Sequence, residues 1–184
     1  VVPDMAVFAK SLSNGFAMGA IVGQRAVMEA AHPMFISSTY WSDTIGLRAA
    51  LTTINEVEKR GVPAQLAEVG QHLVNSVREI AREVGIAMTA GGIEFHPHFA
   101  FQEDDLLLKQ QMTTLFIQEM AKRGCHMGMS FYMNASHGPA EVEQTLAAMR
   151  ETLGLIHEAR ESGTVEDQLE CELKTDTFTK RMVQ

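Results

Sequence analysis

Two short runs of apolar residues lie near the start of the chain, at Met5–Ala9 and Ala20–Gly23, and Pro, Asn and Gly residues bound them. Continuous apolar runs of this length are typical of strands that are covered on both faces. The pattern therefore predicts fragments of an interior sheet. Because such a sheet needs neighbours, we expect them either upstream of Val1 in a longer protein or from another chain.

Helical spacing of apolar residues predicts the larger elements that follow. A short helix from Gln24 is ended by Pro33, and a longer helix covers residues 42–61 with Ser42 or Asp43 as its N-cap. Three further helices each carry one apolar stripe. The stripes are Leu66, Val69, Leu73, Val77, Ile80 and Val84 in residues 64–84; Leu108, Met112, Leu115, Phe116 and Met120 in residues 104–123; and Val142, Leu146, Met149, Leu153 and Ile156 after Pro139.

Strand-like segments separate the last three helices. Two apolar runs lie on either side of Gly91 and Gly92, and residues 125–134 are predicted to form another strand. The two glycines are expected to mark the turn between the first two of these strands.

The order of the elements divides the chain into three parts. Residues 1–60 carry the sheet fragments and form a first part, and residues 61–162 predict a small α+β domain. The tail at 163–184 is polar with scattered apolar residues such as Leu169 and Phe178. We expect this tail to dock on a surface without forming a core.

Charge and cysteine content narrow the classes of function. A net charge of −8 argues against nucleic acid and acidic membranes as partners, since both need a basic face. No stretch has the apolar length of a membrane span, and the N-terminus lacks the pattern of a signal peptide. Cys125 and Cys171 are too far apart for a CxxC metal site or a disulfide framework, so we expect a reducing, cytoplasmic setting.

Lys10 is the first candidate for chemistry, because it follows an apolar strand directly and precedes a polar turn. One interpretation places its amine in solvent beyond the strand. The other places the amine in a site, where partial desolvation makes it a nucleophile that forms a Schiff base with a carbonyl. Gly15 and Gly19 would then allow the backbone to come close to a bound ring.

Hydroxyl side chains form the second candidate. Ser37, Ser38 and Thr39 come shortly before the predicted helix at 42–61, and free N–H groups at a helix start favour a phosphate. Ordinary helix capping explains the same residues. A third candidate is the pair His96 and His98 on one side of a strand, but no Cys or carboxylate at useful spacing joins it, so no metal site is expected.

Three segments together resemble the class III aminotransferases, which are fold type I enzymes that use pyridoxal phosphate, and most closely the glutamate-1-semialdehyde aminomutase branch. The segments are PDMAVFAKSLSNGFAMGAIVG, SSTYWSDTIGLRAALTTINEVE and SFYMNASHGPAEVEQTLAAM, and they occur in the family's order. The resemblance implies an α/β fold. Residues 1–60 would be the end of the large mixed-sheet cofactor domain, and residues 61–162 the small C-terminal domain.

The resemblance also implies roles for individual residues. Lys10 would be the catalytic Schiff-base lysine that holds pyridoxal 5'-phosphate and then moves a proton between the substrate and the cofactor. Thr39, with Ser38, would contact the cofactor phosphate of the partner subunit in a homodimer. The implied activity is amino-group transfer or migration on a small amino acid or amino aldehyde.

Departures from the family pattern lie close to these residues. Ala17 stands where many relatives have Pro, and Ser42–Thr44 where they have Gly-Asn-Pro. The family's acidic partner of the pyridine nitrogen, its phosphate loop and its ring-stacking aromatic residue all precede the lysine. We therefore expect this span alone to be inactive. Two alternatives stay open, a non-catalytic relic that serves as a dimerisation or binding module, and a metal-binding scaffold built on the two strand histidines.

Overall fold

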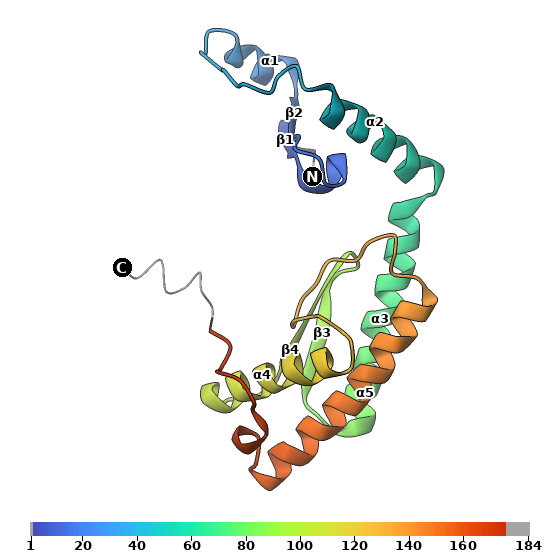
Figure 1. The fold of residues 1–184 in the computed structure, drawn as a ribbon, viewed down its shortest axis with the longest axis vertical. Coiled ribbons are helices and arrows are strands. Elements are labelled where there is room, and N and C mark those ends of the chain that lie inside the picture. The colour runs from blue at the N-terminus through green and yellow to red at the C-terminus, as the bar shows by residue number, and fades with distance from the viewer. Residues whose placement is uncertain (1, 176–184) are drawn as a thin grey trace. The chain divides into compact units, whose positions relative to one another are not determined.

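The computed structural model describes residues 2–175, which form two compact units that divide between Val62 and Pro63 (Figure 1). The elements in chain order are β1 (Met5–Phe8), η1 (Lys10–Ser13), β2 (Ala20–Gly23), α1 (Arg25–Met28), η2 (Glu29–Ala31), α2 (Thr44–Lys59), α3 (Val62–Val84), β3 (Met88–Ile93), β4 (His96–Phe101), α4 (Leu106–Lys122), α5 (Pro139–Ser162) and η3 (Glu166–Gln168), where η marks a 3-10 helix. The assignment of residues 1–60, 61–162 and 163–184 to separate domains of a parent protein stays a prediction.

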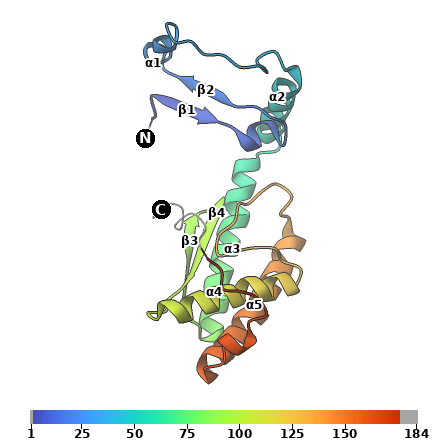
Figure 2. The ribbon, with the colours of Figure 1, turned by 60° about the vertical axis from the view of Figure 1, so that its left-hand side comes forward.

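The first unit is built on a hairpin of the two predicted strands. Strands β1 and β2 pair antiparallel, with Met5 opposite Gly23 and Phe8 opposite Ala20 (Figure 2). Their apolar side chains are largely exposed, for example Val7 at 67% and Ile21 at 58%. The strands are present as predicted, and residues 2–62 leave their faces largely uncovered; the predicted source of the covering layers, upstream of Val1 or another chain, stays a prediction.

Helix α2 agrees with the predicted span 42–61, and Asp43 is its N-cap, with the Asp43 carboxylate accepting a hydrogen bond from Ile45 N at 3.0 Å. The buried residues of α2 are Gly46 and Ala50. Ile45, which the sequence placed on the apolar side of this helix, is 60% exposed. The first unit therefore has almost no core of its own.

The second unit has a continuous hydrophobic core. All five stripe residues of α5 are buried, as are the central residues of the stripes on α3 and α4, which confirms the three predicted apolar faces. Phe99 and Phe101 of β4 point into the same core, and Phe101 meets Phe116 edge to face at 6.3 Å. None of the helices among the described residues is both long enough and apolar enough to cross a lipid bilayer.

The hairpin β3–β4 turns later than the sequence suggested. Ile93 pairs with His96, so the turn is Glu94–Phe95, and Gly91 and Gly92 lie inside β3. The predicted position of the turn at the two glycines is therefore wrong. Gly92 has φ 97°, and a Cβ there would come within 2.8 Å of the His96 carbonyl oxygen, so this glycine serves the local bend of the strand.

The strand predicted at 125–134 does not form. This segment runs beside β4 with one isolated bridge, between His98 and Ser130, and two flanking hydrogen bonds, Phe99 N to Met129 O at 2.7 Å and Met133 N to Phe95 O at 2.9 Å. Between those two bonds lies Pro97 of β4, which has no N–H to donate. The missing donor interrupts the ladder, so only a bridge remains.

A buried carboxylate, Glu119 of α4, ties three segments of the second unit together. Glu119 is 6% exposed and forms ion pairs with Lys122 at 2.8 Å and Arg123 at 2.7 Å. Lys122 also binds Glu170, which follows η3, at 2.7 Å, and Arg123 also binds Glu151 of α5 at 3.0 Å. Burial raises the pKa of Glu119, but hydrogen bonds from Lys122, Arg123 and Gln118 outweigh it and hold the pKa at about 2.

The contact between α3 and the hairpin gives a first prediction. A Cβ at Gly70 of α3 would overlap with the carbonyl oxygen of Glu94, whereas a Cβ at Gly154 of α5 meets nothing within 4 Å. Gly70→Ala should therefore destabilise the second unit by about 1–3 kcal/mol through overpacking. Gly154→Ala should stabilise it by up to about 1 kcal/mol, because alanine is the better helix former. Denaturant unfolding followed by circular dichroism measures both, and shifts of the same sign would contradict the proposed close approach.

The ion pairs of Glu119 give a second prediction, on acid stability. Because the folded pKa of about 2 lies below the ordinary value of 4.5, the carboxylate contributes stability above pH 4.5 that is lost as the pH falls toward 2. Glu119→Gln should lower the free energy of unfolding at pH 7 by at most about 3 kcal/mol, with the difference from the native chain shrinking below pH 4.5. Glu79→Gln, at an exposed position of α3, is the matched control. A gap between Glu119→Gln and the native chain that does not depend on pH would refute this role.

Candidate functional site

Lys10 is the first residue of η1 and follows strand β1 after a single residue, Ala9, whose backbone is extended. The backbone of Lys10 is left-handed, with φ 55°, which an L-residue with a Cβ adopts at a cost of order 1 kcal/mol. Its side chain is exposed. The chain therefore holds the lysine in an uncommon conformation at the end of a strand, a kind of strain that occurs often at functional sites.

The turn after Lys10 is stabilised from within. Ser13 is fully buried, and its hydroxyl donates a hydrogen bond to the Phe16 carbonyl oxygen. Asn14 adopts a second left-handed conformation, with φ 48°, and asparagine tolerates it better than most residues. These contacts stabilise the loop that carries the lysine, and α2 packs closely against the same loop, since a Cβ at Gly46 would come within 2.9 Å of the Ala17 carbonyl oxygen.

Ser38 and Thr39 lie in the exposed loop that joins η2 to α2. The Ser38 hydroxyl accepts a hydrogen bond from Tyr40 N at 3.4 Å, and Asp43 N donates one to Tyr40 O at 3.0 Å. The turn at Tyr40–Asp43 separates the hydroxyls from the start of α2, whose cap position Asp43 occupies. Asp43 was one of the two predicted caps, and the role of the Ser38 and Thr39 hydroxyls toward a phosphate stays a prediction.

The three predicted site residues do not form one cluster in this chain. Among the hydrogen bonds of residues 2–175, none joins Lys10 to Ser38 or Thr39. A shallow groove of about 710 Å³ in the first unit is lined instead by residues of η1, the turn after it and α2: Ser13, Asn14, Phe16, Thr44, Ile45, Arg48, Ala49, Thr52 and Thr53.

The two histidines of β4 form an aromatic contact. The rings of His96 and His98 lie 4.2 Å apart, and Tyr132 stacks on His96 at 4.0 Å with an interplanar angle of 16°. Residues 2–175 contain no group of three or more His, Cys, Asp or Glu residues able to hold a metal ion. The arrangement therefore offers at most two imidazole ligands.

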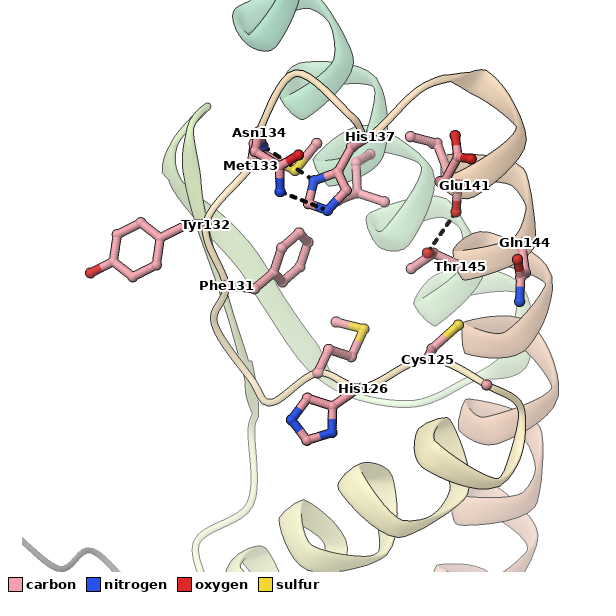
Figure 3. A pocket seen from close by; sticks show the side chains of 14 residues that line it. Cys125, His126, Phe131, Tyr132, Met133, Asn134, His137, Glu141, Gln144 and Thr145 are labelled. Carbon is pink, nitrogen blue, oxygen red and sulfur yellow. Dashed lines mark hydrogen bonds between the residues drawn. The ribbon is translucent and has the colours of Figure 1, made fainter. Parts of the chain in front are cut away.

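A cavity of about 380 Å³ lies in the second unit, between the segment 124–137 and the start of α5 (Figure 3). Much of its wall is apolar, with Phe131 projecting into it. The polar groups of Asn134, His137 and Thr145 bind one another or nearby atoms, as in the 3.2 Å contact between Asn134 Nδ2 and His137 Nε2 and the 2.7 Å bond from Thr145 Oγ1 to Glu141 O. The cavity is a packing feature of this segment and does not include Lys10, Ser38 or Thr39.

Solved structures with the same fold are transaminases. The chain is similar to the FumI protein of Sphingopyxis sp. MTA144 in its PLP internal aldimine form, with a TM-score of 0.78, 20% identity, and coverage of 87% of this chain and 38% of that chain. It is also similar to an omega-transaminase from Sphaerobacter thermophilus, with a TM-score of 0.74, 22% identity, and coverage of 83% and 39%. The chain thus has the fold of the C-terminal part of a fold type I PLP-dependent transferase, which confirms the predicted α/β class.

Sequence comparison identifies the family. Residues 1–153 match the family model described as aminotransferase class-III, so the chain belongs to this family. It is 27% identical over 159 residues to a 3-aminobutyryl-CoA aminotransferase of Cloacimonas acidaminovorans (strain Evry), covering 85% of this chain and 38% of that protein. It is 27% identical over 176 residues to a glutamate-1-semialdehyde 2,1-aminomutase of Ignicoccus hospitalis, covering 85% and 40%. The chain spans about two fifths of the length of these relatives.

One feature of the site was missed from the sequence. The strained backbone of Lys10 has no signal in the residue itself, and only the Asn14–Gly15 pair after it indicated a tight turn. The aromatic residues Tyr40 and Trp41 follow Thr39 directly, are 78% and 62% exposed, and present a large apolar area. Their position beside Thr39 is visible in the sequence itself.

Proposed function

We propose that this chain is the C-terminal part of a PLP-dependent aminotransferase or aminomutase in which Lys10 forms the Schiff base with the cofactor. The observation that carries the proposal is the position of Lys10 at the end of a strand, with a strained backbone, in a segment that matches the family. The chain spans about two fifths of its relatives, so the activity belongs to a protein that also has the other three fifths.

The donor set fits the cofactor in part. A primary amine is the group that condenses with the aldehyde of pyridoxal phosphate, and the hydroxyls of Ser38 and Thr39 are suited to a phosphate. The cofactor supplies an electron sink for the electrons of a broken C–H bond. Lys10 would hold the cofactor through Nζ, and its free amine would hold and move a proton at Nζ.

Thr39 acts across a homodimer interface in this proposal. The loop around it exposes Phe35 at 96%, Tyr40 at 78% and Trp41 at 62%, and aromatic residues of this kind are enriched at protein interfaces. No hydrogen bond among the described residues ties Thr39 to the Lys10 loop, which suits a contact with the cofactor phosphate of the partner subunit.

The proposed substrate is a small amino acid or amino aldehyde. The aminomutase relative supports this choice, since it is named for an amino aldehyde, glutamate-1-semialdehyde, whereas the aminotransferase relative is named for a coenzyme A thioester, 3-aminobutyryl-CoA. The proposed setting is the cytoplasm, since Cys125 and Cys171 are both free thiols.

The role of Lys10 is tested in the protein expressed from its complete gene. Lys10→Arg keeps the charge but removes the nucleophile, and amino-group transfer should fall by more than about a hundredfold because proton transfer at Nζ is lost. Borohydride reduction should attach the cofactor permanently to Lys10 in the native protein. In the Lys10→Arg variant the cofactor should stay unattached to residue 10.

Lys59→Arg, at an exposed lysine of α2, is the control and should keep both activity and the reducible cofactor. The 184-residue chain alone should show no turnover with added pyridoxal phosphate. Full activity of Lys10→Arg would overturn the assignment. A colourless native protein that still dimerises would favour the alternative, a non-catalytic dimerisation module.

The role of Thr39 is tested by removing only its hydroxyl. Thr39→Val should weaken binding of pyridoxal phosphate about tenfold or more, because it removes one hydrogen bond to a charged group. Thr39→Ser keeps the hydroxyl and should retain the affinity. Titration of the apoenzyme followed by visible absorbance measures the dissociation constant. Equal affinity of the valine and serine variants would exclude a hydrogen bond from Thr39 to the phosphate.

A further inference from the structure

The chain continues past α5 as a segment that lies along α4. Gly163 ends α5 in a left-handed conformation, with φ 70°, and the chain then reverses. Val165 is 2% exposed and belongs to the core, and Leu169 packs partly against it. Residues 154–175 lie outside the part of the chain that matches the family model. We call residues 166–174 the strap.

Side chains of α4 bind the main chain of the strap. Gln118 donates from Nε2 to Gln168 O at 3.0 Å and accepts at Oε1 from Glu170 N at 2.8 Å. Four to eight residues earlier on α4, Thr114 Oγ1 accepts from Lys174 N at 3.0 Å, and Gln110 Nε2 donates to Lys174 O at 2.8 Å. These side chains meet the N–H and C=O groups of the strap as a neighbouring strand would.

Charged and polar side chains complete the contact. Lys122 Nζ lies between Glu119 of α4, at 2.8 Å, and Glu170 of the strap, at 2.7 Å, and Gln111 Nε2 donates to Glu166 Oε2 at 3.2 Å. Hydrogen bonds from Lys122 to Glu119 and to Glu170 raise the pKa of Lys122. Glu170 is 69% exposed, so salt screens its attraction to Lys122.

The surface under the strap differs from the core-facing surface of α4. Its residues Gln110, Gln111, Thr114, Gln118 and Lys122 recur at helical spacing and are all polar. Opening the strap therefore places mainly polar groups in water, where they are hydrated, and removes one partly buried apolar side chain, Leu169, from the edge of the core.

We propose that the strap is a releasable latch that opens as a unit while the core of the second unit stays folded. The strap opens beyond Val165, which stays in the core and keeps the base of the strap in place. Rising ionic strength favours the open form, because the link between Lys122 and Glu170 is screened while the buried pair of Lys122 and Glu119 is screened less.

Amide hydrogen exchange of the full 184-residue chain tests the latch. In Gln118→Ala, which removes the side chain that binds both Gln168 and Glu170, the amides of the strap should exchange about tenfold faster. The amides of α5 from Leu146 to Ile156 should keep their rates. Gln71→Ala, at an exposed glutamine of α3 that bonds only to Asn75 of its own helix, is the control and should change neither set.

A second variant tests the charge. In the native chain, raising the salt concentration from 0.05 to 1 M (about a fourfold fall in the screening length) should speed exchange of the Glu170 amide, and Lys122→Met should abolish that dependence. Exchange of the strap and α5 at one common rate would overturn the latch, because opening would then be global unfolding. Unchanged exchange in Gln118→Ala would overturn it as well. Dimerisation that depends on concentration and protects the strap would show that it binds a second copy instead.

Discussion

The hydrophobic core that α3, α4, α5 and the β3–β4 hairpin share is the constraint on which the second unit depends. Its largest members, among them Phe101, Phe116 and Met149, are fully buried, and close packing of this kind fixes the helices relative to the hairpin. The approach of α3 to the hairpin is close enough that Gly70 lies against the Glu94 carbonyl. The turn Glu94–Phe95 is therefore set by the helix beside it as well as by its own residues.

The first unit depends on local contacts and not on a core of its own. Its strands and α2 bury little, and its exposed apolar side chains, such as Val7, Phe35 and Leu51, resemble the interior of a larger protein. What it does fix is local: the turn from β1 into η1, the buried hydroxyl of Ser13 and the left-handed backbone of Lys10. Local backbone contacts therefore hold Lys10 in the position that the proposed function requires.

Predictions from periodicity succeeded where one face of a helix is buried, because the stripes on α3, α4 and α5 depend only on spacing along the chain. Predictions that depended on pairing failed. The segment 125–134 has strand-like residues, but its ladder depends on Pro97 in another strand. The N-cap of α2, by contrast, was predicted as Ser42 or Asp43 and is Asp43, because a cap depends only on residues next to it in the chain.

The sequence by itself determined the family, the three amphipathic helices of the second unit and the identity of Lys10 as the candidate nucleophile, because each rests on spacing or on an ordered set of motifs. Only the tertiary structure decided the strain at Lys10, the position of the hairpin turn and the covered polar face of α4. The last of these has a plain physical reason. A face of Gln, Thr and Lys predicts exposure to water, and only a partner main chain with matching N–H and C=O groups, here residues 166–174, allows such a face to be covered.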